Sequence, residues 1–257
     1  MKNTLTLLFL IQSFFLFAQS EKLNITYSTE FKVPEGTDLS SLISNAEDFA
    51  DSPEIKQMII KKLLEPEFSN LIIQQNISVF TPIDKIDNKQ YTSELNVNVN
   101  NPKILIYKET DSKKYYKTTY IGNKDVIIMD DLPNYNWTVT RETKTILGYE
   151  TKKAIGEINN NKVVAWYTTA IPNKTGPFNY WGLPGLILEI EIESKFNEDV
   201  MAKKITRITE ITTVSDKKNL VLPKSSKYYT QEEYISEINK LKNKIKEMEN
   251  NGVDTGN

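Results

Sequence analysis

Three glutamates at alternate positions, Glu189, Glu191 and Glu193, come closest in type and spacing to a catalytic arrangement. In a strand, side chains two residues apart lie on one face, roughly 7 Å from each other. Glycoside hydrolases place two carboxyl groups about 5–10 Å apart, so this spacing permits acid–base chemistry or cation binding. Any strand with one face in water shows the same alternation, and we expect these glutamates to lie on a solvated face.

Four aromatic residues near this strand are the second group of interest: Trp166, Phe178, Tyr180 and Trp181. They could line a pocket for an apolar or sugar ligand. They could equally be core side chains that hold the neighbouring turn, which is the commoner role of large aromatic residues. The sequence leaves both roles open, and we name these four residues as the candidate ligand-binding wall.

Composition removes several classes of chemistry. The chain has no His and no Cys, which excludes Ser-His-Asp triads, His-ligated zinc, disulfides and thiolate nucleophiles. Neither a phosphate-binding Gly-Lys-Ser/Thr loop nor a calcium loop occurs. The 32 basic and 34 acidic residues are well mixed, so no strong field attracts nucleic acid or anionic membranes. We predict no catalytic residue, no metal site, no cofactor and no nucleic-acid partner.

The segment Gly182-Leu-Pro-Gly185 predicts a sharp turn directly before an apolar strand. Pro184 presets the φ of the second turn position, and Gly185 can adopt a positive φ at the third, which defines a type II turn. We expect Gly182 to permit a close backbone approach just before it. After the turn, period two predicts one apolar face made of Leu186, Leu188, Ile190 and Ile192.

The elements that must position these residues are mostly strands, because apolar side chains recur with period two along the chain. The predicted strand segments are 23–33, 71–79, 104–107, 115–121, 126–129, 137–141, 149–158, 163–169, 186–192 and 201–214. Turn residues separate them, and Asn159-Asn160-Asn161 is typical of a hairpin turn.

Two segments favour helix. Residues 39–65 include a helix start at Ser52-Pro53, and Pro66 ends it. The capping box Thr230-Gln-Glu-Glu233 predicts a second helix over about 230–250. Its apolar seam either packs on the parent domain or docks a partner helix; the seam residues are Tyr234, Ile238, Leu241, Ile245 and Met248.

Together these elements predict a mainly β protein with a few helices (α+β). We expect a strongly curved antiparallel sheet or half-barrel, covered by the helices. The simplest organisation is a signal peptide over residues 1–18 and a single β-rich domain over residues 19–257.

The first 18 residues have the pattern of a secretory signal peptide. Lys2 is followed by an apolar run from Leu5 to Phe17 and by the small residue Ala18. A retained N-terminal anchor is the alternative. Because no Cys follows the run, a lipid anchor is excluded. We expect a monomer in the periplasm or outside the cell, without a membrane span after cleavage.

The run Gly182-Leu-Pro-Gly-Leu-Ile187 resembles the GLPGLI family of exported Bacteroidetes proteins. Family members often carry a Cys shortly after a Gly-Tyr pair, where this chain has Glu150-Thr151, so any role of that thiol does not transfer. The resemblance implies export and no catalytic residues. The resemblance spans about 135–195. Within that stretch the matching residues include Trp137, 144–149, 152–154, 165–168, 171–172 and 176–177.

The sequence therefore favours a non-enzymatic envelope protein that binds an apolar ligand, either a lipid or a lipidated partner, or another protein. A carboxylate-type hydrolase acting on carbohydrate is one alternative. A protein-interaction module that uses the C-terminal helix is the other.

Overall fold

The computed structural model describes residues 21–37, 39, 53–83, 104–158, 161–195, 201–215 and 218–251. Three sequence predictions lie wholly or partly outside these residues. They are the signal peptide over 1–18, the first part of the helical segment over 40–52 with its cap Ser52, and residues 159–160 of the predicted hairpin turn.

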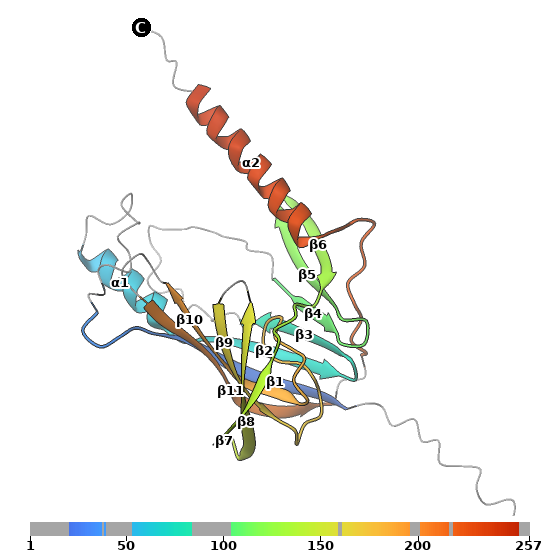
Figure 1. The fold of residues 1–257 in the computed structure, drawn as a ribbon. Helices are drawn as coiled ribbons and strands as arrows, with labels where there is room; N and C mark the ends of the chain where they lie inside the picture. The colour runs from blue at the N-terminus through green and yellow to red at the C-terminus, as the bar shows by residue number, and fades with distance from the viewer. Residues whose placement is uncertain are drawn as a thin grey trace, which may run out of the picture.

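One twelve-stranded sheet contains most of the described chain (Figure 1). Its order is β12-β6-β5-β4-β3-β2-β1-β11-β10-β9-β8-β7, and the two end strands do not pair, so the sheet is open. The strands are β1 (Lys22–Lys32), β2 (Glu67–Gln74), β3 (Ile77–Pro82), β4 (Ile106–Glu109), β5 (Lys114–Ile121), β6 (Lys124–Asp131), β7 (Thr138–Ile146), β8 (Tyr149–Ile158), β9 (Asn161–Thr168), β10 (Leu186–Lys195), β11 (Met201–Val214) and β12 (Tyr228–Tyr229).

The sheet is antiparallel except where β12 runs parallel to β6. Strands β1 and β11 pair along their length at its centre and join a meander of β2–β6 to a meander of β7–β11. Strand directions turn markedly between β2–β3 and β8–β9 (Figure 1), as the right-handed twist of paired strands requires. The mainly β, antiparallel prediction is confirmed in this coarse form.

The predicted strand over 71–79 is two strands rather than one. Gln75 and Asn76 form a turn between β2 and β3, and Gln75 has a φ of 55°. The polar side chains Gln74, Gln75 and Asn76 interrupt the apolar alternation, and Asn-containing turns tolerate positive φ.

The two described helices contact separate parts of the sheet, so helical cover of the sheet is only partly shown. Helix α1 (Pro53–Leu64) contacts β1, and α2 (Gln231–Asn251) contacts β5, β6 and β12. The predicted capping box is confirmed: Thr230 N–H donates to Glu233 Oε2 at 2.8 Å, and Glu233 N–H donates to Thr230 Oγ1 at 3.1 Å. Neither described helix is long and apolar enough to span a bilayer.

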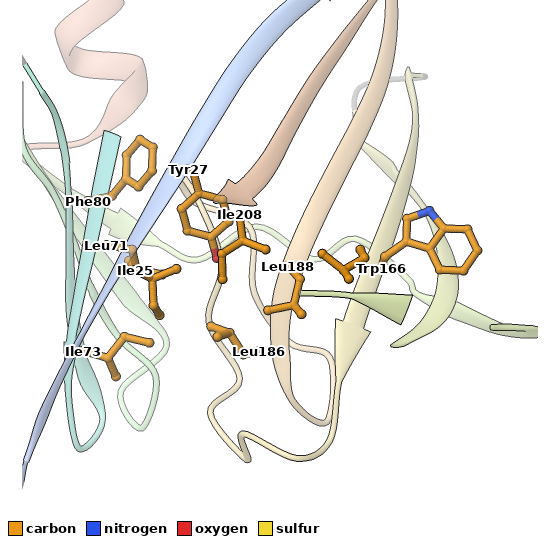
Figure 2. Packing of buried hydrophobic residues seen from close by; sticks show 10 residues of the cluster. Ile25, Tyr27, Leu71, Ile73, Phe80, Trp166, Leu186, Leu188 and Ile208 are labelled. Carbon is orange, nitrogen blue, oxygen red and sulfur yellow. The ribbon is translucent and has the colours of Figure 1, made fainter. Parts of the chain in front are cut away.

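The buried apolar residues form two clusters. The first core cluster draws side chains from β1, β2, β3, β7, β9, β10 and β11, and Figure 2 shows Tyr27 and Phe80 beside its aliphatic members. The second core cluster gathers β8–β10 around Tyr135, Tyr180 and Leu183. Together the two clusters include Phe178 and Tyr180, which belong to the loop between β9 and β10.

Strand β10 does not present the single apolar face that period two predicts. Leu186 and Leu188 belong to the first core cluster, whereas Ile190 belongs to the second. The cause is a register shift between Ile187 and Glu189 in the pairing with β9. One extra residue there reverses the alternation for the rest of the strand.

In the turn before β10, each of the two glycines has the role that the sequence predicted for the other. Gly182 has the positive φ, at 94°, whereas Gly185 does not, so the predicted type II turn centred on Pro184-Gly185 is wrong. A Cβ on Gly185 would lie 2.7 Å from the carbonyl carbon of Thr168 and closer still to its oxygen. Gly185 is therefore required by a close backbone approach, and Gly182 by its conformation.

We expect Gly185→Ala to destabilise the protein more than Gly148→Ala. Gly148 has a φ of 80° but open space around it, so its replacement costs about 1–2 kcal/mol in backbone strain alone. Gly185→Ala meets fixed backbone, and we expect a cost at or beyond the upper end of the about 1–3 kcal/mol typical of overpacking. Urea unfolding of both variants measures this, and equal losses would contradict the close approach at Gly185.

Candidate functional site

The loop 169–185, between β9 and β10, reaches across to strands in the other half of the sheet. Thr175 Oγ1 lies 3.0 Å from Ser78 Oγ of β3, with both residues buried. Asn173 Nδ2 donates to Gln75 O at 2.9 Å. The loop therefore connects the meander of β2–β6 to the meander of β7–β11 through specific polar contacts.

Lys108 of β4 makes the most demanding of these contacts. Its side chain is fully buried, and its ammonium donates to the carbonyl oxygens of Gly176, of Phe178 at 2.7 Å and of Tyr180 at 3.3 Å. Burial lowers the pKa of Lys108 well below its usual value. No described carboxylate lies within ion-pair distance, so three backbone carbonyls match the three donors of the ammonium.

Beside this anchor lies a cavity of about 310 Å³, which we call the aromatic–lysine pocket. It is assembled from β4, β5, β10, β11, the loop 169–185 and the first residue of α2. The carbonyls of Phe178 and Tyr180 are fixed by Lys108, so the anchor also sets the position of these two lining residues. The lining residues are Ile106, Tyr115, Lys117, Phe178, Asn179, Tyr180, Ile192, Lys204, Thr206 and Gln231.

The polar groups of the pocket are mostly donors. Lys204 Nζ lies 4.9 Å from the centroid of the Phe178 ring, and burial lowers its pKa although the charge of Glu67 opposes the shift. Burial, with a smaller effect of Asp130, raises the pKa of Tyr115 to about 12, so its hydroxyl stays protonated at neutral pH. Asn179 Oδ1 accepts from Tyr135 Oη at 3.2 Å, which leaves the amide nitrogen of Asn179 to donate elsewhere.

A second, wider groove of about 840 Å³ lies on the other side of Tyr135. Its lining mixes polar and apolar residues of the 133–138 segment, β8 and β9. These residues are Pro133, Asn134, Asn136, Thr138, Ile155, Gly156, Glu157, Ile158 and Lys162. Two indoles brace its wall reciprocally: Trp137 Nε1 donates to Trp181 O and Trp181 Nε1 donates to Pro133 O, each at 2.8 Å. Trp181 is therefore a bracing residue of this wall.

The candidate ligand-binding wall predicted from sequence is divided by the structure. Phe178 and Tyr180 line the aromatic–lysine pocket, whereas Trp181 braces the second groove. Trp166 is 8% exposed and packs in the first core cluster. Sequence reasoning did not find Lys117, Lys204 or Gln231, because they come from β5, β11 and α2 and share no local motif.

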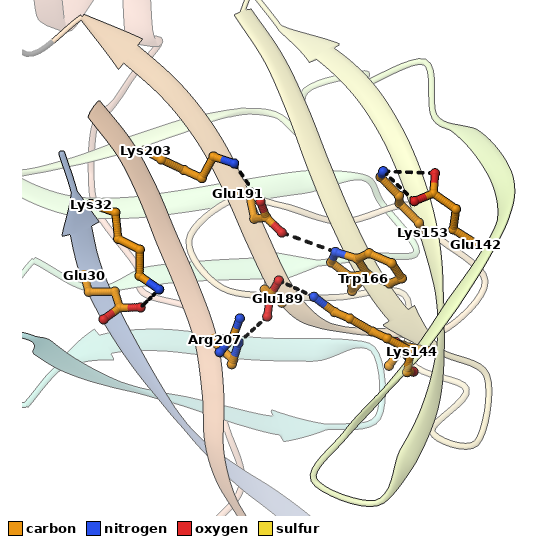
Figure 3. Close-up of polar contacts among 11 residues, drawn as sticks. Glu30, Lys32, Glu142, Lys144, Lys153, Trp166, Glu189, Glu191, Lys203 and Arg207 are labelled. Atoms are coloured by element: carbon orange, nitrogen blue, oxygen red, sulfur yellow. Dashed lines mark hydrogen bonds and ion pairs between the residues drawn. The ribbon is translucent and has the colours of Figure 1, made fainter. Parts of the chain in front are cut away.

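The expectation that the three glutamates share a solvated face is wrong for Glu189, which is fully buried. Lys144 Nζ lies 2.6 Å from its Oε1, and Arg207 Nε donates to its Oε2 (Figure 3). Both cations thus contact the carboxylate of Glu189. Lys144 Nζ also lies over the indole of Trp166, 4.1 Å from the ring centroid. The ion-pair network thus belongs to the packing of β7, β9, β10 and β11.

The remaining two glutamates have different surroundings. Glu191 accepts from Trp166 Nε1 at 3.4 Å and lies 3.5 Å from Lys203 Nζ, while the side chain of Glu193 is 69% exposed. Only Glu193 matches the solvated strand face that the alternation predicted.

Glu189 is poorly suited to act as a general acid. Desolvation raises the pKa of its carboxyl group, but hydrogen bonds from Arg207 and Lys144 outweigh it and hold the pKa below its usual value. A general acid at neutral pH needs a raised pKa. The arrangement therefore stabilises a permanent buried charge.

A family model described as "N-glycanase peptide, N-terminal domain" matches residues 63–230, which include both pockets apart from Gln231. The chain belongs to this family.

Two solved structures are similar to the chain. "Structure of PNGF-II in C2 space group" has a TM-score of 0.54 and 20% identity over 86% of this chain and 33% of that chain. "Structure of PNGF-II in P21 space group" has a TM-score of 0.47 and 18% identity over 76% and 29%. At this identity, the first of these shows a shared fold alone. The chain spans about a third of the length of these structures, and no curated protein matches it.

We expect Lys108→Met to loosen the loop 169–185, because the carbonyls of residues 176, 178 and 180 lose their donor. The free energy of unfolding should fall by about 1–3 kcal/mol, the usual cost of unsatisfied buried polar groups. Hydrogen exchange should accelerate at the amides of Tyr180 and Gly182, which donate to carbonyls within this loop. The exposed Lys124, replaced in the same way, is the control; unchanged exchange in Lys108→Met would contradict the anchor.

We expect Glu189→Gln to destabilise the protein at pH 7 by about 1–3 kcal/mol, because the partly exposed cations Lys144 and Arg207 lose their buried carboxylate partner. The folded pKa of Glu189 is below the unfolded value of about 4.3, so its contribution is complete above that pH and is lost as pH falls through the folded value. Denaturation at pH 7 and at about pH 3 should therefore show a difference that shrinks in acid. Glu193→Gln is the matched control, and a pH-independent loss for Glu189→Gln would refute the ion-pair explanation.

Proposed function

We propose that this protein binds the carbohydrate of glycoproteins without cleaving it, and that the aromatic–lysine pocket is the binding site. One observation carries the proposal: aromatic rings and convergent hydrogen-bond donors line the same cavity. A sugar ring offers an apolar C–H face for packing on Phe178 and hydroxyl groups for Asn179, Gln231 and the lysines. Pockets with a few convergent polar groups among apolar side chains are the usual form of small-ligand sites.

The class of ligand is supported by the family to which the chain belongs. This family is named for an N-glycanase, and the chain corresponds to about a third of a solved structure called PNGF-II. Binding, without hydrolysis, is favoured by the site itself. No carboxylate lines the pocket among the described residues, and Glu189 has a lowered pKa. Glu189, the leading candidate for the hydrolase that the sequence left as an alternative, therefore does not support that alternative.

The apolar ligand favoured by the sequence is the competing proposal for the same pocket. Ile106, Ile192 and the aromatic rings support it. Half of the lining is made of lysine, amide and hydroxyl side chains, which a lipid chain would leave without partners. Carbohydrate satisfies both halves of the lining, and we prefer it for this reason.

We also propose that the protein is exported by the segment 1–18 and acts in the periplasm or outside the cell as a monomer. We also propose a relationship to the GLPGLI family, on the basis of the run Gly182-Leu-Pro-Gly-Leu-Ile187. Secretion of a reporter fused to residues 1–18, and its absence after Lys2 and the apolar run are replaced, would support export.

The binding proposal is tested by calorimetric titration with the neutral N-glycan core pentasaccharide, three mannose and two N-acetylglucosamine units. Wild-type protein should bind, and Phe178→Leu should lower the affinity about 5- to 10-fold by removing the stacking surface. Phe68→Leu is the matched control, because Phe68 is 43% exposed on β2 and outside the pocket.

Palmitate and a lysophospholipid are titrated in parallel. Absence of sugar binding with saturable lipid binding would overturn the carbohydrate proposal in favour of an apolar ligand. Release of the amide-linked sugar from a glycopeptide by the purified chain would instead overturn the claim that the protein does not cleave its ligand.

A further inference from the structure

We propose that the aromatic–lysine pocket selects sugars that carry a carboxylate, such as a sialic or uronic acid, with Lys117 and Lys204 receiving the acidic group. This inference rests on the proposed carbohydrate function and names the class of sugar. It concerns the two cations of the pocket, which recognition of a neutral sugar does not require.

The first support is the charge of the lining. Lys117 and Lys204 both line the cavity, and no acidic residue is among its lining residues. Some described lysines pair with a carboxylate, for example Lys114 of β5 with Asp131 of β6 at 2.6 Å. No described carboxylate lies within ion-pair distance of Lys117 or Lys204.

The second support is the surroundings of Lys204. Its ammonium lies between the rings of Phe178 and Phe31, at 4.9 Å and 5.6 Å from their centroids. Burial lowers its pKa although the charge of Glu67 opposes the shift. A carboxylate in the pocket would add a charge-assisted hydrogen bond to this ammonium. Cation–π contact with Phe178 holds the ammonium next to the surface on which a sugar ring would stack.

The third support separates an acidic sugar from a simple anion. A volume of about 310 Å³ equals that of about ten water molecules, enough for one sugar ring with its carboxylate. Tyr115 Oη donates to Gln231 Oε1 at 3.4 Å and Tyr135 Oη donates to Asn179 Oδ1 at 3.2 Å, which leaves the amide nitrogens of Gln231 and Asn179 as donors beside this volume. Phe178, Ile106 and Ile192 supply an apolar face. A small inorganic anion would use the two cations and leave the rest of the lining unoccupied.

The test compares 3′-sialyllactose with lactose, and glucuronic acid with glucose, by calorimetric titration at low ionic strength. We expect the acidic member of at least one pair to bind about 10-fold or more tightly, the usual gain from a hydrogen bond to a charged group. Raising the salt concentration should reduce this preference. Acetate, which offers the carboxylate without the ring, should bind at least 10-fold more weakly than the acidic sugar.

Substitutions of single lysines test which residues cause the preference for the acidic sugar. Lys117→Gln and Lys204→Gln should each bring the affinity for the acidic sugar close to that for its neutral partner. Lys124→Gln, on the exposed end of β6, is the matched control and should keep the preference. Because Lys204 is partly buried against two rings, Lys117→Gln provides the test if Lys204→Gln does not fold.

The outcomes separate the two proposals. Equal binding of acidic and neutral sugars by the wild-type protein overturns the acidic preference and leaves carbohydrate binding standing. Absence of binding to any of these sugars and to the core pentasaccharide overturns both. Acetate binding as tight as the acidic sugar, or a preference that survives Lys117→Gln, overturns the assignment of the pocket to acidic sugars.

Discussion

The buried ammonium of Lys108 is the interaction on which the arrangement of this protein depends. A lysine that is fully buried without a described carboxylate partner is expensive unless its three donors are satisfied. The carbonyls of Gly176, Phe178 and Tyr180 can satisfy them only if the loop 169–185 lies against β4. The same contact adds to the pairing of β1 with β11, which joins the two meanders of the open sheet. One side chain thus holds the loop against the other half of the sheet.

The aromatic–lysine pocket is a consequence of that anchor. Phe178 and Tyr180 can face Lys117 and Lys204 because their backbone is held from the opposite side by Lys108. A separate ion-pair network, Lys144–Glu189–Arg207, stabilises the meander of β7–β11 and takes the glutamate that looked most like a catalytic residue. The protein therefore uses Lys108 and Glu189 for packing and keeps Lys117 and Lys204 beside a cavity. This division is the basis of the proposal that the pocket binds a ligand.

Local chemistry was sufficient where neighbours along the chain decide the structure. The capping box at Thr230 forms as predicted, and the positions of most strands follow from period two. Errors arose where a residue's role depends on a distant segment. Gly185 is required by the carbonyl of Thr168, and the shifted register at Ile187–Glu189 depends on β9, so neither is visible in the local pattern. Of the candidate ligand-binding wall, Phe178 and Tyr180 reach a pocket, while Trp166 and Trp181 serve packing.

The sequence by itself determined the mainly β class, the start of α2 and the absence of imidazole and thiol chemistry. Each of these follows from residue type or short-range periodicity. Only the tertiary structure decided that Lys108 is an anchor, that Glu189 is buried, and that Tyr115, Lys117, Lys204 and Gln231 share a cavity with Phe178. The reason is physical: pairing of strands distant in sequence sets burial and charge environment, and these determine what a lysine or a glutamate does.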